Sequence, residues 1–447
     1  MSTVAKLKIE PVDLSALAEK LGTDFAARAE VADETDCFVA ENYEALKTSG
    51  LVEAGVPVEL GGGGASIAEL GQMLRVLAHH CSSTALAFAM HSQQVAIPAW
   101  RWHNQKIAAV EPLLKRIAAE KIIILTSGGS DWVAGSGKAE RVEGGYKITA
   151  RKIFASASPV GSLLMTSAVF EEPGQDASVL HFGIPMNSPH VHIDPTWKTL
   201  GMRGTASHDV VIDGHVVPDA GVALQRKAGE WHPLFHVIAT IAIPLIYSAY
   251  LGVAESARNI AVELAKKRRT DHHTLQLLGQ MDSELRGAQM AHQYMMDVVA
   301  RNAPSAESVN DVMIGRRLMA THAIRAVELA MEAAGGQLSI AHGGLNAGSA
   351  TFRARAITRC RQGRRQNMLA QWRWACRWAR YSKPVLLPCD GKQGCDQWRN
   401  RIAVHCHKAN RVADDRLGER NSLDTFQRPK GVLEIIRHDG AESHAAH

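Results

Sequence analysis

The stretch "KTLGMRGTASHDVVIDGHVVP", residues 198–218, decides what the rest of the chain is expected to be. Its second half alternates β-branched and polar residues around the turn dipeptide Asp213-Gly214, and this predicts a strand, a tight turn and a second strand. Its first half places the glycine-flanked Arg203 before the hydroxyls of Thr205 and Ser207. Packing alone does not explain these polar residues, so we expect a loop that approaches a polar partner.

The same two-residue period extends upstream as far as Ile122, through runs such as "GKAERVEGGYKITARKIFASAS" and "SVLHFGIPM". Residues 121–230 are therefore predicted to be an all-β domain, either a sandwich or a barrel, of which we favour the barrel. Residues 1–120 repeat apolar positions at helical spacing, and residues 231–348 are predicted to form an antiparallel helical bundle. Its helices are expected at Phe235–Arg269, Leu275–Ala303 and Val309–Ala334. The predicted fold class is α+β: a helical N-terminal domain, a middle β-barrel and a C-terminal helical bundle.

The bulk properties fit a soluble enzyme-sized protein. The 447 residues are 46% hydrophobic and 21% charged, as in ordinary globular chains of two or three domains. The first residues lack an apolar core, which argues against a signal peptide and for a cytoplasmic location. Phe235–Ala254 is long enough to span a membrane, but its His236 and Pro244 favour a helix buried in the bundle. The glycine run in "ELGGGGAS" is predicted to be a connection, because it lacks the Lys-Ser/Thr of a phosphate loop.

Four motifs, taken in order, resemble those of the acyl-CoA dehydrogenase family of flavoproteins, and the resemblance covers residues 27 to about 348. They are "ILTSGGSDWVAG" (124–135), "YKITARKIFAS" (146–156), "TLGMRGTASHDVVIDGHVVP" (199–218) and "AMEAAGGQ" (330–337). The resemblance implies FAD as cofactor and α,β-dehydrogenation of an acyl-CoA in fatty acid metabolism. It also implies electron-transfer flavoprotein as a partner and a homo-oligomer, which we expect to be a tetramer.

The resemblance also implies the residues that hold the flavin. A flavin needs polar contacts around its pyrimidine ring and a flat apolar wall. Phe154 takes the place of the family's ring-stacking tryptophan, and Arg268 matches an arginine that meets the FAD diphosphate, a task that suits the guanidinium fork. The other predicted contacts are polar or glycine residues of the motifs: Thr126, Gly129, Ser130, Ser156, Gly335 and Gly336.

One departure from the family bears on the chemistry. Removing an α-proton from an acyl thioester requires a carboxylate base. Neither Ile238–Leu251 nor Thr351–Pro388, where family members carry it, contains an acid. Glu255 is the nearest carboxylate, and we expect it to face solvent, so no catalytic base is assigned. The alternatives are a flavin-dependent monooxygenase on the same fold, or a non-catalytic or truncated member. The histidine pairs at 79–80 and 272–273 lack further ligands at useful spacing, so no metal site is predicted.

Residues 349–447 differ from the rest. From residue 351 onward there are sixteen Arg and four Lys against nine Asp or Glu, and five of the seven cysteines. A basic appendage for nucleic acid or an acidic protein is one interpretation. The other is a frameshift: "QNMLAQWRWACRW" (366–378) can be reverse-translated so that the neighbouring frame reads "EHAGAMAMGLPV", which resembles the C-terminal end of family members. We predict the frameshift and consider nucleic acid an improbable partner. A segment without an amphipathic period is expected to pack poorly and to leave FAD weakly held.

Resequencing the gene across the codons for residues 348–355 tests this prediction. We expect a missing or additional nucleotide there. A confirmed reading frame, together with stable FAD binding by the purified protein, would contradict the frameshift and leave a true basic extension.

Overall fold

The computed structural model describes residues 13–127, 133–199, 201–266 and 270–334. All of them belong to the first of two compact units, Met1–Tyr381, and the second unit, Ser382–His447, lies outside the described residues. The predictions made for the basic tail therefore also lie outside them. The limits predicted for the individual domains remain predictions.

The N-terminal part is helical, as predicted. Its helices are α1 (Leu14–Thr35), α2 (Ala40–Thr48), α3 (Ile67–His80), α4 (Ser82–Gln105) and α5 (Glu111–Glu120). Local chemistry sets their starts: the Asp13 side chain accepts the amides of the first turn of α1, and Ser66 and Glu69 form a capping box at α3.

The glycine run before α3 is a connection, in agreement with the prediction. The amides of Gly62, Gly63 and Gly64 donate to carbonyls of residues 53–57. At Gly62 a Cβ would lie 2.4 Å from the Val56 carbonyl oxygen, so only glycine fits this close approach. With those amides already bonded within the protein, the run does not present the row of free N–H groups that cradles a phosphate.

The middle region forms one eight-stranded sheet in the order β6-β7-β3-β2-β4-β5-β8, with β1 paired to β4. The strands are β1 (Ile124–Thr126), β2 (Lys138–Val142), β3 (Gly145–Ala155), β4 (Leu163–Phe170), β5 (Ser178–Pro185), β6 (Val191–Asp194), β7 (His208–Pro218) and β8 (Val222–Lys227).

The sheet is open, so the predicted barrel is wrong. Closure would require the edge strands β6 and β8 to pair, but β6 has only four residues and the chain leaves β8 for the helical bundle. The two halves of the sheet meet between β2 and β4 in a parallel ladder of just two residue pairs, Lys138 with Val169 and Ala139 with Phe170. Alternating patterns identify strands but do not specify which edges meet.

The predicted turn at Asp213-Gly214 is also wrong, because β7 runs through it as one strand. On both sides of the dipeptide β7 pairs with β3, and the register shifts between Ile148 and Thr149. Gly214 adopts a φ of 73°, which accommodates the extra residue as a bulge. The same dipeptide suits a turn or a bulge, and the long partner strand β3 decides between them.

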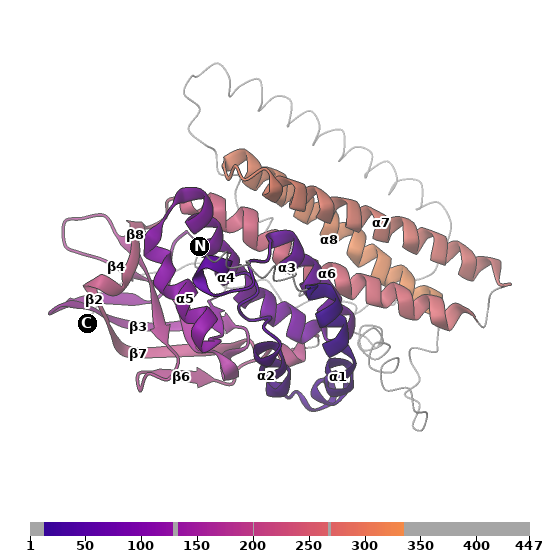
Figure 1. Cartoon of the computed structure of the whole chain (residues 1–447), viewed down its shortest axis with the longest axis horizontal. Helices are drawn as coiled ribbons and strands as arrows, with labels where there is room; N and C mark the ends of the chain where they lie inside the picture. The colour runs from indigo at the N-terminus through magenta and orange to yellow at the C-terminus, as the bar shows by residue number, and fades with distance from the viewer. Residues whose placement is uncertain (1–12, 128–132, 200, 267–269, 335–447) are drawn as a thin grey trace, which may run out of the picture. The chain divides into compact units, whose positions relative to one another are not determined.

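The C-terminal helices are α6 (Leu234–Ala265), α7 (His272–Ala300) and α8 (Ala306–Ala334), close to the predicted limits. They pack on one another, and α6 also packs on α3 and α4, as Figure 1 shows. Among the described residues α6 is the one helix long and apolar enough to cross a membrane, but 78% of its most apolar window is buried in the protein. This confirms the prediction of a buried bundle helix.

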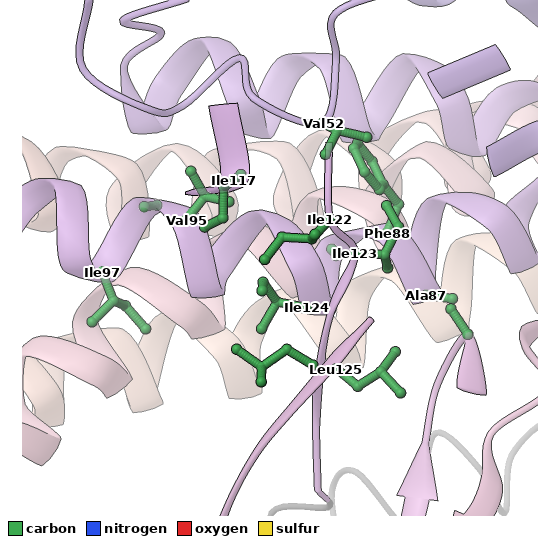
Figure 2. Close-up of a cluster of buried hydrophobic side chains, with 14 of the residues drawn as sticks. Val52, Ala87, Phe88, Val95, Ile97, Ile117, Ile122, Ile123, Ile124 and Leu125 are labelled. Atoms are coloured by element: carbon green, nitrogen blue, oxygen red, sulfur yellow. The ribbon is translucent and has the colours of Figure 1, made fainter. Parts of the chain in front are cut away.

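The core continues from the helices into the sheet. Figure 2 shows the place where they meet: side chains of α4 and α5, including Phe88, Val95 and Ile117, surround the chain that enters β1. Ile123, Ile124 and Leu125 in that chain are each 1% exposed. Burying such side chains contributes about 1.5–3 kcal/mol each, so the start of β1 is firmly fixed.

A buried charge cluster ties α6 to α3 and α7. Glu255 is 7% exposed, which corrects the expectation that it faces solvent. Its carboxylate accepts hydrogen bonds from Arg75 Nε at 2.7 Å and Gln289 Nε2 at 2.6 Å, and it lies 3.0 Å from His79 Nε2. Burial alone would raise the pKa of Glu255, but the hydrogen bonds from His79 and Arg75 and the Arg75 charge outweigh it and lower the pKa to about 2.

We expect Glu255→Gln to lower the free energy of unfolding by roughly 2–3 kcal/mol near neutral pH, because it leaves Arg75 without its buried counter-charge. The folded-state pKa lies below the ordinary 4.5, so the carboxylate's contribution is complete above that pH and is lost as the pH falls toward 2. Urea unfolding at several pH values measures both effects.

The matched control is Asp282→Asn, which breaks the exposed pair of Asp282 with Arg258 and should cost less than about 1 kcal/mol. Equal losses in the two variants, or a Glu255→Gln effect that grows as the pH falls, would contradict the assignment.

Candidate functional site

Two loops beside the paired strands β3 and β7 store backbone strain. We call them the β3 loop (residues 154–158) and the η5 loop (residues 202–207), the latter containing the short helix η5 (Arg203–Thr205). Four described non-glycine residues of these loops have a left-handed backbone, with φ values of 61°, 61°, 55° and 41°: Phe154, Ala157, Met202 and Ala206. The other described non-glycine residues with such a backbone lie at or next to the ends of α-helices. Such conformations cost on the order of 1 kcal/mol or more each and collect at functional sites.

Hydrogen bonds lock the two loops together. The amide of Ala157 donates to the Thr205 carbonyl at 2.8 Å, and the Ser158 hydroxyl donates to the Ala206 carbonyl at 2.9 Å. These bonds hold the strained backbone in one conformation.

Phe154 is the first residue of the β3 loop. Its half-buried ring is edge-on to Trp197, with 5.9 Å between ring centroids. Trp197 is fixed in turn, because its Nε1 donates to the Met202 carbonyl and its amide to Nδ1 of His208, each at 3.1 Å. Burial lowers the pKa of His208, which keeps its imidazole neutral and able to accept this bond.

The polar partner expected for the η5 loop is inside the protein. Arg203 forms an ion pair with Asp36, which caps the end of α1. A Cβ on Gly204 would lie 3.3 Å from that of Ser83 near the start of α4, so the loop approaches this helix closely. The Gly-Met-Arg-Gly-Thr sequence therefore joins the sheet to the N-terminal helices.

The structure places three of the predicted flavin contacts. Phe154 and Ser156 belong to the β3 loop, and Thr126 ends β1, where its hydroxyl donates to the Ser127 carbonyl at 2.9 Å. The segment after the β3 loop rests on β1, since a Cβ on Gly161 would lie 2.3 Å from Cδ1 of Leu125. The remaining predicted contacts lie outside the described residues: Gly129, Ser130, Arg268, Gly335 and Gly336.

A second polar cluster was not predicted, because its residues follow no motif. Arg226 is 5% exposed, and its guanidinium donates from Nε to His181 Nε2 at 3.0 Å and lies 4.9 Å from the ring centroid of Phe235 at the start of α6. Burial, with the charge of Arg226, lowers the pKa of His181 to about 4. The imidazole is therefore neutral at physiological pH.

Comparison with known proteins gives the class. Residues 15–115 match the model of the acyl-CoA dehydrogenase N-terminal domain. A putative acyl-CoA dehydrogenase from Bacillus subtilis (strain 168) is 28% identical over 56% of this chain and 65% of its own length. An amino sugar nitrososynthase from Streptomyces rubradiris is 25% identical over 54% of this chain and 58% of its own length. The chain thus spans less than two thirds of the length of these curated relatives.

The fold agrees with this assignment. A dibenzothiophene monooxygenase from Paenibacillus sp. A11-2, solved with FMN and indole, has a TM-score of 0.63 at 19% identity. The match covers 82% of this chain and 96% of that one. These matches support an assignment to the acyl-CoA dehydrogenase family, in agreement with the resemblance of the sequence motifs.

We expect Ala157→Gly to leave the free energy of unfolding within about 0.5 kcal/mol of wild type. Relief of the left-handed strain, about 1–2 kcal/mol, offsets the lost methyl burial and the added chain entropy. Ala168→Gly removes an equally buried methyl from the extended strand β4 and should cost roughly 1.5 kcal/mol. Denaturant unfolding of both variants checks this, and equal losses would mean that the loop is unstrained.

Proposed function

We propose that the protein is a flavin-dependent monooxygenase, which uses reduced flavin and molecular oxygen to oxidise a small molecule. The observation that carries this proposal is the lack of an available carboxylate base on α6, within the part of the chain that the structure describes. The sequence of Ile238–Leu251 contains no acid, and Glu255, one turn further along α6, is held by Arg75 and His79 with a pKa of about 2. Dehydrogenation of an acyl thioester needs such a base, whereas oxygen activation does not.

The residues of the two loops fit a flavin. A half-buried aromatic ring, Phe154, lies beside a half-buried hydroxyl, Ser156, on strained and rigid backbone. A planar heterocycle with one polar edge requires this combination of flat wall and hydrogen-bonding group. When bound, a flavin supplies the redox chemistry, as a hydride acceptor in its oxidised form and as an activator of oxygen in its reduced form.

In this proposal Phe154 supports the ring, Ser156 and Thr126 meet its polar edge, and Arg268 meets the phosphate end. Gly129, Ser130, Gly335 and Gly336 complete the site, following the family resemblance. FAD is the cofactor that the resemblance implies, and FMN is the flavin bound in the Paenibacillus structure. Titration with both flavins decides between them.

The second candidate is an acyl-CoA dehydrogenase that passes electrons to electron-transfer flavoprotein. The match of residues 15–115 to the family's N-terminal domain and the Bacillus relative favour it. In either case we propose a cytoplasmic homo-oligomer acting on a small molecule.

The decisive experiment uses the purified full-length chain loaded with FAD or FMN. Monooxygenation predicts that a panel of acyl-CoA thioesters does not bleach the flavin without oxygen. It also predicts that reduced flavin with ¹⁸O₂ and indole as probe yields a labelled product. Anaerobic bleaching by an acyl-CoA would establish the dehydrogenase instead, and failure to bind either flavin would leave a non-catalytic family member.

We expect Phe154→Ala to weaken flavin binding by roughly 2- to 12-fold, the effect of removing an aromatic contact of about 0.5–1.5 kcal/mol. The quenching of flavin fluorescence on binding should change as well. The control is Phe170→Ala, at the far end of β4 from the loops, where the ring contacts Tyr146. Unaltered flavin affinity and spectrum in the Phe154 variant would show that this ring packs within the protein and does not contact the flavin.

A further inference from the structure

A row of hydroxyls runs from the half-buried Ser156 into the interior between the two loops. Ser156 Oγ lies 2.8 Å from Ser207 Oγ, which lies 2.8 Å from Thr205 Oγ1. Thr205 Oγ1 donates to the carbonyl oxygen of Met202 at 2.9 Å. Ser207 is 5% and Thr205 1% exposed, so the inner members of the row are shielded from water.

The carbonyl at the inner end fixes the direction of every bond in the row. A hydroxyl carries one proton, and a carbonyl oxygen can only accept. Thr205 uses its proton on Met202, so its contact with Ser207 must be donated by Ser207. The proton of Ser207 is then used, and Ser156 must donate to Ser207. Ser156 is therefore left with lone pairs alone for any further contact.

We infer that Ser207 and Thr205 hold the Ser156 hydroxyl as an obligate hydrogen-bond acceptor, and that the site thereby selects the reduced over the oxidised flavin. This inference rests on the proposed flavin function. Reduced flavin carries an additional ring N–H, which can donate to the Ser156 lone pairs. The oxidised ring offers a bare nitrogen in its place, and two facing lone pairs repel.

The backbone that carries Ser156 is fixed on both sides. Its amide donates to the Phe154 carbonyl at 3.0 Å, and the next amide, of Ala157, donates to Thr205 at 2.8 Å. Phe154 and Ala157, on either side of Ser156, hold left-handed φ values of 61°. Ser207 and Thr205 are thus positioning residues, and Ser156 is the group that meets the ligand.

The test measures the dissociation constants of oxidised and anaerobically reduced FMN and FAD for the full-length chain. Wild type should bind the reduced form more tightly. Ser207→Ala removes the acceptor of the Ser156 proton, so Ser156 can donate to the bare nitrogen of the oxidised ring. The preference for reduced over oxidised flavin should then fall by roughly 2- to 12-fold, which is the contribution of one hydrogen bond. A tenfold fall appears as a drop of about 30 mV in the two-electron midpoint potential of the bound flavin.

Ser92→Ala is the matched control, because Ser92 is also buried and its hydroxyl also donates to a carbonyl, that of Phe88, but it lies within α4, outside the two loops. It should leave the preference unchanged. If Ser207→Ala does not fold, Thr205→Val takes its place, because it removes the acceptor of the Ser207 proton and so allows Ser207 to donate to Ser156 instead. Thr205→Ser, which keeps the hydroxyl, should retain the wild-type ratio of the two dissociation constants.

A double-mutant cycle distinguishes a change in the direction of the Ser156 hydrogen bond from a general disruption of the site. In a Ser156→Ala background, Ser207→Ala should no longer alter the ratio, because the responding hydroxyl is gone. A Ser207→Ala effect that persists in that background, or that weakens both redox forms equally, would overturn the inference. Equal affinity of wild type for both forms would overturn it while leaving flavin binding intact. No binding of either form would reject the proposed function and the inference together.

Discussion

The carbonyl oxygen of Met202 is the contact on which the candidate site depends. It accepts from the Trp197 indole, from the Thr205 hydroxyl and from the Thr205 amide, at 3.1, 2.9 and 3.2 Å. Met202 holds a left-handed φ of 55° in this arrangement. The strain of that conformation persists because several bonds would have to break together to relieve it.

Placement of charge in the helical layers has a chemical consequence. A buried carboxylate is tolerated only when cations and amides satisfy it, and Arg75, His79 and Gln289 do this for Glu255. The same contacts that stabilise the packing of α6 on α3 and α7 remove the nearest acid from acid–base chemistry. Packing energetics and the proposed reaction class are therefore linked through one side chain.

Much of the architecture could be predicted from the sequence. Periodicity located the bundle helices within a few residues, and four ordered motifs carried the family resemblance that the comparisons support, because both signals are local or repeated. The bulge at Gly214 and the open edges of the sheet could not be found, since the length of a partner strand decides them. The environment of Glu255 was missed for the same reason: its partners lie 180 and 34 residues away in the chain. The sequence singles out the hydroxyls of Thr205 and Ser207, but only the fold shows that Ser207 bonds to Ser156 and Thr205 to Ser207.

The short junction between β2 and β4 has a mechanical meaning. A ladder of two residue pairs is the weakest line in the sheet, and it divides β6, β7, β3 and β2 from β1, β4, β5 and β8. The chain crosses this line from β3 to β4 through the loop that carries Ser156. The sheet thus consists of two parts that meet in this one short ladder, and the β3 loop connects them. Bending at the short ladder would alter the spacing between Ser156 and Thr126 without breaking the long ladders on either side.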